Sequence, residues 1–198
     1  MNRLNKRSPL AFLLLFAIGP FLAGCTSSAV GIGAMSGLAA YEERPLKVIA
    51  RDAKIALQVR TALLKKSENH FLQIGIEVFE GRVLLTGAVD SEQTRADAVG
   101  LAWKTNNVKA VLNEIMIGPN SISDAAKDAY ITAQLTSRIT LDKKIMAVNY
   151  SIETVASTVY LIGIAQNKLE LEKVLGHARA LGYVRKIISH VRIKKHTS

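Results

Sequence analysis

The segment Gly81-Arg-Val-Leu-Leu-Thr-Gly87 returns 76 residues later as Ser157-Thr-Val-Tyr-Leu-Ile-Gly163, with valine, leucine and glycine at the same places. The same shift aligns residues 52–117 with 128–193 without a gap, and most apolar positions keep their character. Self-similarity at one fixed offset is the signature of a duplicated structural unit. The chain of 198 residues therefore carries two copies of a domain of about 70 residues, a common domain size.

In both copies the apolar residues recur with the same succession of helical and strand spacings. In the first copy, apolar residues recur at i, i+4 and i+8 over residues 55–63, which predicts an amphipathic helix. Period-2 alternation over 74–78 and 83–87 predicts a β-hairpin around a tight turn. A second helix over about 91–105, capped by Asp90 or Ser91, and a last alternating strand over 111–117 complete the copy.

The second copy repeats these elements over 131–139, 148–152, 159–163, 167–181 and 187–193, with Asn167 available as an N-cap. The order α-β-β-α-β predicts an α+β fold in each copy. We expect a two-layer sandwich, in which a three-stranded mixed sheet carries both helices on one face.

The first 24 residues have the features of a secretory signal peptide. A basic start is followed by an apolar run over residues 10–24, which ends at the single cysteine, Cys25. Leu22-Ala-Gly-Cys25 resembles the lipobox of bacterial lipoproteins, and this resemblance implies that Cys25 is the acylated mature N-terminus. Thr26, in place of an aspartate, implies sorting to the outer membrane. The alternative is an uncleaved N-terminal anchor.

The sequence divides into four segments. We expect a signal peptide at 1–24, an acylated cysteine with a Gly-rich flexible tether at 25–45, a first domain at 46–118 and a second at 119–198. A packed glycine-rich helix is the alternative for the tether.

The repeated motifs resemble the BON domain of bacterial envelope proteins. The closing segments Val108-Lys-Ala-Val-Leu-Asn-Glu-Ile115 and Val184-Arg-Lys-Ile-Ile-Ser-His-Val191 carry this resemblance together with the two hairpins. A lipobox followed by two such domains is similar to a group of outer-membrane lipoproteins that face the periplasm. The resemblance implies no catalytic activity, binding of anionic phospholipid such as phosphatidylglycerol or cardiolipin, and support of envelope integrity.

In that group the first helix of the second domain contacts lipid, and an aromatic residue of this helix enters the bilayer. Carried over to this chain, the helix is about 124–141 and the aromatic is Tyr130, where a member of the family has tryptophan. The helical period places Tyr130 off the core stripe. The candidate lipid-binding residues are Tyr130, Lys127, Ala133, Ser137, Lys143 and Lys144. A tyrosine covered by the neighbouring domain is the alternative.

Charge also distinguishes the two copies. The net charge of the chain is +10, and it is uneven: residues 46–118 hold 10 basic and 8 acidic residues, whereas residues 119–198 hold 12 and 6. A basic domain with an outward aromatic fits anionic headgroups. Nucleic acid is a poor candidate partner because the signal peptide sends the chain out of the cytoplasm.

Enzyme and metal chemistry find no support in the sequence. The four histidines lack the spacing of metal ligands, and each is expected at the surface. No nucleophile–base motif and no phosphate-binding loop occurs in the sequence. We therefore expect no catalytic residue, no metal and no cofactor. Asp52 and Asp128 are expected to favour the helix dipole from a first turn. Trp103 is expected to pack against the sheet or the other domain. The alternative function is a protein–protein adaptor for outer-membrane assembly or peptidoglycan-remodelling proteins.

Overall fold

A computed structural model describes residues 42–118 and 122–195, except for the side chains of 69–71 and 122–123. The proposed acylation site, Cys25, lies outside the described residues. Residues 38–198 form one compact unit, and its described part contains every hydrophobic core cluster assigned below. This part of the chain therefore has what it needs to fold on its own.

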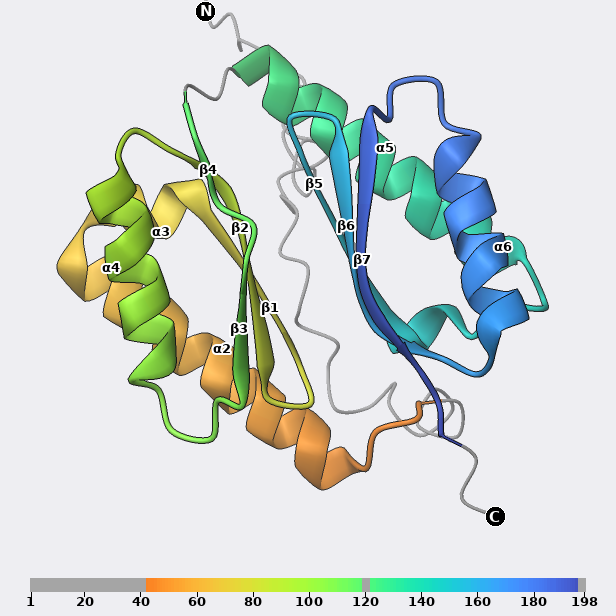
Figure 1. Ribbon diagram of the computed structural model, residues 1–198, viewed down its shortest axis with the longest axis horizontal. Helices are drawn as coiled ribbons and strands as arrows, with labels where there is room; N and C mark the ends of the chain where they lie inside the picture. Colours follow the sequence, from red (N-terminus) through yellow and green to blue (C-terminus); the bar gives the residue numbers. More distant parts are fainter. Residues whose placement is uncertain (1–41, 119–121, 196–198) are drawn as a thin grey trace, which may run out of the picture. The chain divides into compact units, whose positions relative to one another are not determined.

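Both copies have the predicted element order (Figure 1). The first repeat comprises α2 (Leu46–Lys66), α3 (Glu68–Gln73), β1 (Ile74–Phe79), β2 (Arg82–Val89), α4 (Glu92–Trp103), β3 (Ala110–Asn113) and β4 (Met116–Ile117). The second comprises α5 (Ile122–Leu141), the 3-10 helix η2 (Ala147–Asn149), β5 (Tyr150–Val155), β6 (Thr158–Ala165), α6 (Lys168–Arg179) and β7 (Lys186–Ile193). The α+β prediction is confirmed.

Each sheet is mixed, as predicted. β2 lies in the middle of the first sheet, antiparallel to β1 and parallel to β3 and β4; β6 lies between β5 and β7 in the same way. The glycines near the ends of β2 and β6, Gly87 and Gly163, have φ values of 121° and 158°. A Cβ atom at either position would lie 2.1 Å from a carbonyl oxygen, that of Gln73 or Asn149. Glycine is required there because the preceding chain passes so close.

Both helices of each repeat pack on the same face of its sheet. Ile55, Val59 and Leu63 of α2 are at most 1% exposed and form one core with β1, β2 and two alanines of α4. The second helices begin where the sequence predicts, because the side chains of Ser91 and Asn167 accept hydrogen bonds from the backbone N–H groups of Thr94 and Glu170.

Four expectations about local structure were wrong or incomplete. Val148, expected in a strand, lies in η2, and β5 begins only at Tyr150. The last strand of the first repeat is interrupted after Asn113 and continues as β4. The short helix α3 was not predicted. Trp103 is 53% exposed instead of packed, because α4 rests on the sheet through the small residues Ala98 and Ala102.

The two repeated aspartates do not act through the helix dipole, and this prediction was wrong. Asp52 is the seventh residue of α2, is 3% exposed, and accepts hydrogen bonds from the backbone N–H groups of Glu80 (2.7 Å) and Gly81 (2.9 Å). Asp128 of α5 accepts from Ala156 (2.6 Å) and Ser157 (2.8 Å) in the same way. In each repeat one carboxylate therefore ties the first helix to the turn of the β-hairpin.

These turns need a fixed partner because their backbones are left-handed. Glu80 and Gly81 have φ values of 55° and 77°, and Ala156 and Ser157 have values of 48° and 63°. Two consecutive positive φ angles define a type I′ hairpin turn, which favours asparagine and glycine. The second turn has neither residue, so its conformation depends more strongly on the hydrogen bonds to Asp128.

The two sheets pack against each other through the faces that the helices leave free. Phe79 and Leu84 of the first repeat form one buried cluster with Val155, Tyr160 and Ile162 of the second. β2 and β6 are therefore buried on both faces, which explains their nearly continuous apolar sequences. The helices consequently lie on the outer sides of the paired sheets (Figure 1).

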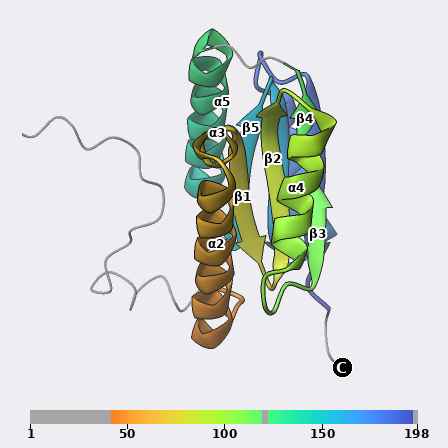
Figure 2. The ribbon, with the colours of Figure 1, turned by 90° about the vertical axis from the view of Figure 1, so that its left-hand side faces the viewer.

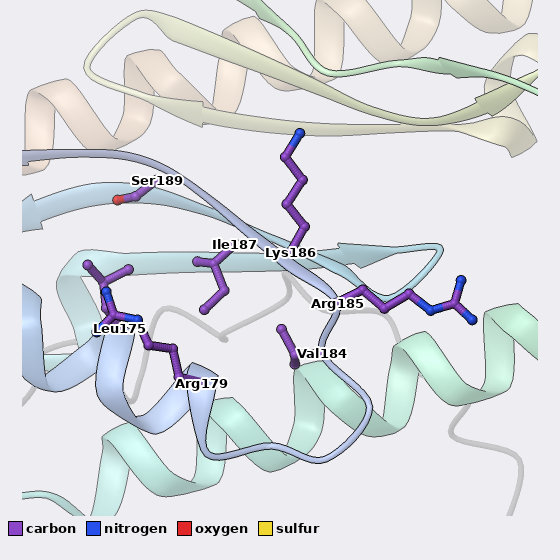
Figure 3. A pocket seen from close by; sticks show the side chains of 7 residues that line it. All are labelled: Leu175, Arg179, Val184, Arg185, Lys186, Ile187 and Ser189. Carbon is purple, nitrogen blue, oxygen red and sulfur yellow. The ribbon is translucent and has the colours of Figure 1, made fainter.

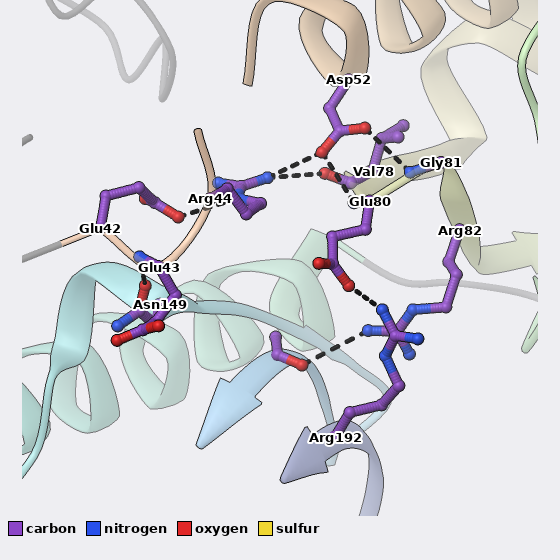
Figure 4. A network of polar contacts seen from close by, with 11 residues as sticks. Glu42, Glu43, Arg44, Asp52, Val78, Glu80, Gly81, Arg82, Asn149 and Arg192 are labelled. Carbon is purple, nitrogen blue, oxygen red and sulfur yellow. Dashed lines mark hydrogen bonds and ion pairs between the residues drawn. The ribbon is translucent and has the colours of Figure 1, made fainter. Parts of the chain in front are cut away.

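Polar contacts reinforce this packing (Figure 4). The guanidinium group of Arg82 donates to the carbonyl oxygens of His190 (2.7 Å) and Gly163 (3.3 Å). Arg192 forms an ion pair with Glu80. Glu43, just before α2, pairs with Lys194 at 2.8 Å, and its backbone N–H donates to Asn149 of the second repeat. The start of the described chain is thus held by the second repeat.

Equivalent glutamates of the two repeats, Glu77 on β1 and Glu153 on β5, also face each other. Burial raises the pKa of both, and the charge of Glu77, followed by that of Asp128, helps to raise the pKa of Glu153 to about 7. Ser151 donates to Glu77, and the positive charge of Arg60 opposes both shifts. Contact between the sheets therefore brings two carboxylates together that cannot both ionise without cost.

Replacing Asp128 with alanine should lower the free energy of unfolding by about 2–4 kcal/mol, because two buried turn N–H groups lose a charged acceptor. Urea denaturation of residues 38–198 measures this. Glu172→Ala, which removes only an exposed ion pair at 3.7 Å, is the control and should change stability by less than about 0.5 kcal/mol. Equal effects of the two substitutions would contradict the assigned role of Asp128.

Glu153→Gln should alter how stability depends on pH. A carboxyl group whose pKa is raised from 4.5 to about 7 binds more protons in the folded state between these values, so its stabilising contribution is complete below pH 4.5 and is lost as the pH rises to 7. The variant and the parent should be similar at pH 5, and the variant should be more stable at pH 8. Denaturation at both pH values tests this, and an unchanged difference would contradict it.

Candidate functional site

The outward face of α5 carries the aromatic that the sequence singled out. Tyr130 is 54% exposed and Leu141, at the end of the helix, is 78% exposed. Ala133 and Ser137 lie exposed between them. The opposite face of α5 is buried through Ile131 and its neighbours. The helix therefore presents a row with one bulky residue at each end and small residues in the middle, and the neighbouring first domain does not cover Tyr130.

A second exposed aromatic lies beside this row. Tyr183, in the loop after α6, is 60% exposed, and the ammonium group of Lys127 lies 5.7 Å from its ring centroid. Lys127 is one helical turn before Tyr130, so the cation stands close to both aromatics. Tyr183 is not among the residues predicted from the sequence. The repeat offset could have found it, because the equivalent residue of the first copy is Asn107, just as Lys54 is the equivalent of Tyr130.

The two remaining predicted residues lie at the other end of the helix. Lys143 and Lys144 are exposed in the loop after α5, about 20 Å from Tyr130 at 1.5 Å per residue. The loop is held by Asp142, which contacts His177 at 3.0 Å and accepts a hydrogen bond from the backbone N–H of Lys144. These hydrogen bonds, first that of His177, lower the pKa of Asp142. The structure thus spreads the predicted cations along α5 and does not cluster them.

A cleft of about 440 Å³ lies between α6 and the start of β7 (Figure 3). Leu175, Val184 and Ile187 provide apolar lining, while Arg179 and Arg185 extend toward opposite ends (Figure 3). None of the predicted lipid-binding residues lines it. The cleft is therefore separate from the α5 row.

The described histidines take part in carboxylate pairs. His177 contacts Asp142, and His190 contacts Glu114 of the other repeat at 2.8 Å. The side chains of His70 and His196 lie outside the described part of the chain. Within residues 42–118 and 122–195, no three His, Cys, Asp or Glu side chains gather where they could hold a metal ion. No helix among these residues is long and apolar enough to cross a membrane.

A buried carboxylate of the second repeat has a structural role. Glu170 is 4% exposed, and it accepts a hydrogen bond from the hydroxyl group of Tyr150 at 2.8 Å. Burial and this hydrogen bond raise the pKa of Tyr150. Backbone N–H groups of Met146 and Gln166 also point to Glu170. The carboxylate therefore fastens two loops to α6.

Comparison with known proteins gives consistent matches. A family model described as the BON domain matches residues 51–119 and 127–195. These ranges are offset by the same 76 residues as the repeat.

Relatives match over most of their length. A protein of Anaplasma centrale, "Uncharacterized protein in gshII 5′region", is 41% identical over 72% of this chain and 95% of its own. The outer membrane lipoprotein DolP of Haemophilus influenzae is 28% identical over 81% of this chain and 83% of its own. The 21 kDa hemolysin of Actinobacillus pleuropneumoniae is 25% identical over 76% of this chain and 73% of its own length.

Tyr130→Ala and Tyr183→Ala should leave the fold intact, each changing the free energy of unfolding by less than about 0.5–1 kcal/mol, because both rings are more than half exposed. Urea denaturation of residues 38–198 checks this. A loss of several kcal/mol would show that the rings are structural, and the exposed row would no longer be a candidate site.

Proposed function

The chain belongs to the BON-domain family, and from this premise we propose that it is a periplasm-facing outer-membrane lipoprotein whose second BON domain binds anionic phospholipid through α5. Phosphatidylglycerol and cardiolipin are the lipids of this class that we assign to it. The similarity to DolP, a protein named as an outer membrane lipoprotein, supports the location. Binding of this kind would serve the integrity of the envelope.

The observation that carries the proposal is the exposed aromatic pair with its cation. Tyr130 and Tyr183 are both more than half exposed, and Lys127 lies beside them. Tyrosine is enriched at membrane interfaces because its ring is apolar and its hydroxyl group is polar. A basic residue near an anionic surface contributes about 1 kcal/mol. The equivalent positions of the first repeat hold Lys54 and Asn107, which are not aromatic, and this difference supports a contact through the second repeat.

The remaining predicted residues extend this contact along the helix. Ala133 and Ser137 are small, so they allow the backbone of α5 to approach the headgroups. Lys143 and Lys144 then contact headgroups beyond Leu141. This arrangement suits a helix that lies flat on a surface, with its apolar side chains entering the boundary between headgroups and acyl chains.

Acylation of Cys25 would supply the firm part of membrane attachment. Two or three acyl chains give stable anchoring, whereas weak contacts from a domain do not. Anchoring raises the effective concentration of α5 at the surface, so that weak headgroup contacts become occupied. The lipid contact then determines how the second domain lies on the membrane.

Sedimentation of residues 38–198 with vesicles tests the proposal without the acyl anchor. Binding should require phosphatidylglycerol or cardiolipin and weaken as salt is added. Tyr130→Ala should reduce the partition coefficient about fivefold to tenfold, corresponding to roughly 1 kcal/mol of lost interfacial burial. Lys143→Gln/Lys144→Gln should also reduce it.

Leu169→Ala is the matched control, because Leu169 is 70% exposed and lies on α6, not on α5. It should bind as the parent does. If the parent binds no vesicle of any composition, or if Tyr130→Ala binds as strongly as the parent, the lipid assignment fails. A protein–protein adaptor then becomes the better explanation.

A further inference from the structure

The outer strand of the second sheet, β7, has one edge without a partner. β6 lies along its other edge, and no further strand among the described residues pairs with β7. The backbone N–H of Lys194 donates to Ala165 of β6, whereas that of Val191 points to the hydroxyl group of Ser189. Because backbone groups alternate in direction along a strand, residues 187, 189, 191 and 193 present their N–H and C=O groups to the open edge. This edge is therefore a template for a further strand.

Both faces of β7 are already in use, so the edge is the part that remains available. Ile187 and Val191 pack on the core of the second repeat. His190 and Arg192 point the other way and contact carboxylates of the first repeat. β7 runs without interruption over Lys186–Ile193, whereas the equivalent edge of the first sheet is divided between β3 and β4 (Figure 2). The second repeat therefore has the longer continuous edge.

The cleft between α6 and β7 lies beside the first half of this edge. Its volume of about 440 Å³ is in the range of pockets that bind ligands. Leu175, Val184 and Ile187 form its apolar lining (Figure 3). Ile187 and Ser189 belong both to the cleft and to the open edge. A chain added along β7 would therefore pass the cleft and place an apolar side chain in it.

The charge around the cleft is positive. Arg185 and Lys186 are exposed and form no ion pair within the part of the chain that the structure describes. Arg179 pairs with Glu172 at 3.7 Å, and both side chains are exposed, so this pair contributes little. At the three equivalent positions of the first repeat, only Lys109 is basic. The cations therefore favour an acidic ligand for the second repeat.

We propose that β7 binds an extended acidic segment of a partner protein by strand addition, with an apolar side chain of that segment in the cleft. Backbone hydrogen bonds to the open edge supply affinity, while the cleft and its cations select the sequence. None of the candidate lipid-binding residues lines the cleft, so the proposal does not depend on lipid binding. The second repeat then holds a protein with β7 and a membrane with α5.

An extended acidic segment fits this edge better than two other occupants. A second copy of the chain, paired through its own β7, would bring cations against cations, which is unfavourable in neighbouring strands. A layer of anionic headgroups would neutralise the cations, but it has no extended backbone with which to continue the ladder of hydrogen bonds. A peptide segment with carboxylates satisfies the cations and the backbone groups together.

A labelled peptide tests the proposal on residues 38–198. The probe is fluorescein-labelled Glu-Asp-Val-Thr-Leu-Thr-Asp-Glu, whose acidic ends suit either strand direction. Its fluorescence anisotropy should rise to saturation as protein is added. The affinity should fall at least tenfold when the acidic residues are replaced by their amides. N-methylation of the central residues leaves every charge in place but blocks the ladder, and it should abolish binding.

Charge reversal in the protein gives a matched comparison. Arg185→Glu/Lys186→Glu should weaken binding of the acidic peptide at least tenfold, because carboxylates would then face carboxylates. Lys47→Glu/Lys54→Glu, at exposed positions of α2, changes the net charge by the same amount and should have a much smaller effect. Equal losses in the two variants would show a response to total charge alone and would overturn the assignment to β7.

Hydrogen exchange locates the bound peptide. Exchange at Ile187, Ser189 and Val191 should slow when the peptide is added, while exchange in α5 should not change. If the acidic peptide does not bind, or if its N-methylated form binds equally well, strand addition at β7 is overturned. If the peptide does not bind and Arg185→Glu/Lys186→Glu instead weakens sedimentation with phosphatidylglycerol vesicles, the cations serve the lipid contact, and the proposed function stands without this inference.

Discussion

The bond between a buried aspartate and a hairpin turn holds each repeat in its shape. Asp52 and Asp128 each accept two backbone hydrogen bonds from a turn whose residues have positive φ angles. The turn sets the register of the hairpin, and the carboxylate fixes the first helix against it. Because equivalent aspartates anchor α2 and α5, the outward faces of these helices have defined directions. The candidate membrane-binding residues depend on this single constraint.

The packing of the two sheets against each other is the second constraint on the structure. Once β2 and β6 are buried on both faces, the helices are the elements that remain on the outside. Contact between the sheets also buries Glu77 and Glu153 near each other and uses Arg82 to cover carbonyl groups of the second repeat. The repeats are therefore coupled by apolar area and by charge, and their helices lie on the two outer faces of one compact unit.

Much of the fold could be predicted from the sequence because its signal is local and occurs twice. The helix periods, the alternating strands and the caps at Ser91 and Asn167 depend on neighbouring residues, and the repeat offset confirms each one. Contacts between distant residues could not be predicted. The role of Asp52 depends on a turn 28 residues away, and the exposure of Trp103 depends on how closely two alanines let α4 approach the sheet.

The candidate site was predictable only in part, for a related reason. Tyr130 was predicted from the family resemblance, and the comparison of repeats adds that its counterpart in the first copy, Lys54, is not aromatic. Tyr183 lies in a loop, where hydrophobic periods give no signal.

Hydrogen exchange of residues 38–198 with and without phosphatidylglycerol vesicles tests the central claim most directly, because it locates the bound surface without a substitution. We expect slower exchange in α5 and in the loop around Tyr183, and unchanged exchange in α4 and α6. Phosphatidylcholine vesicles should produce no change. Protection confined to α4, α6 or the outer strands β3 and β7, or the same protection with neutral lipid, would contradict the account.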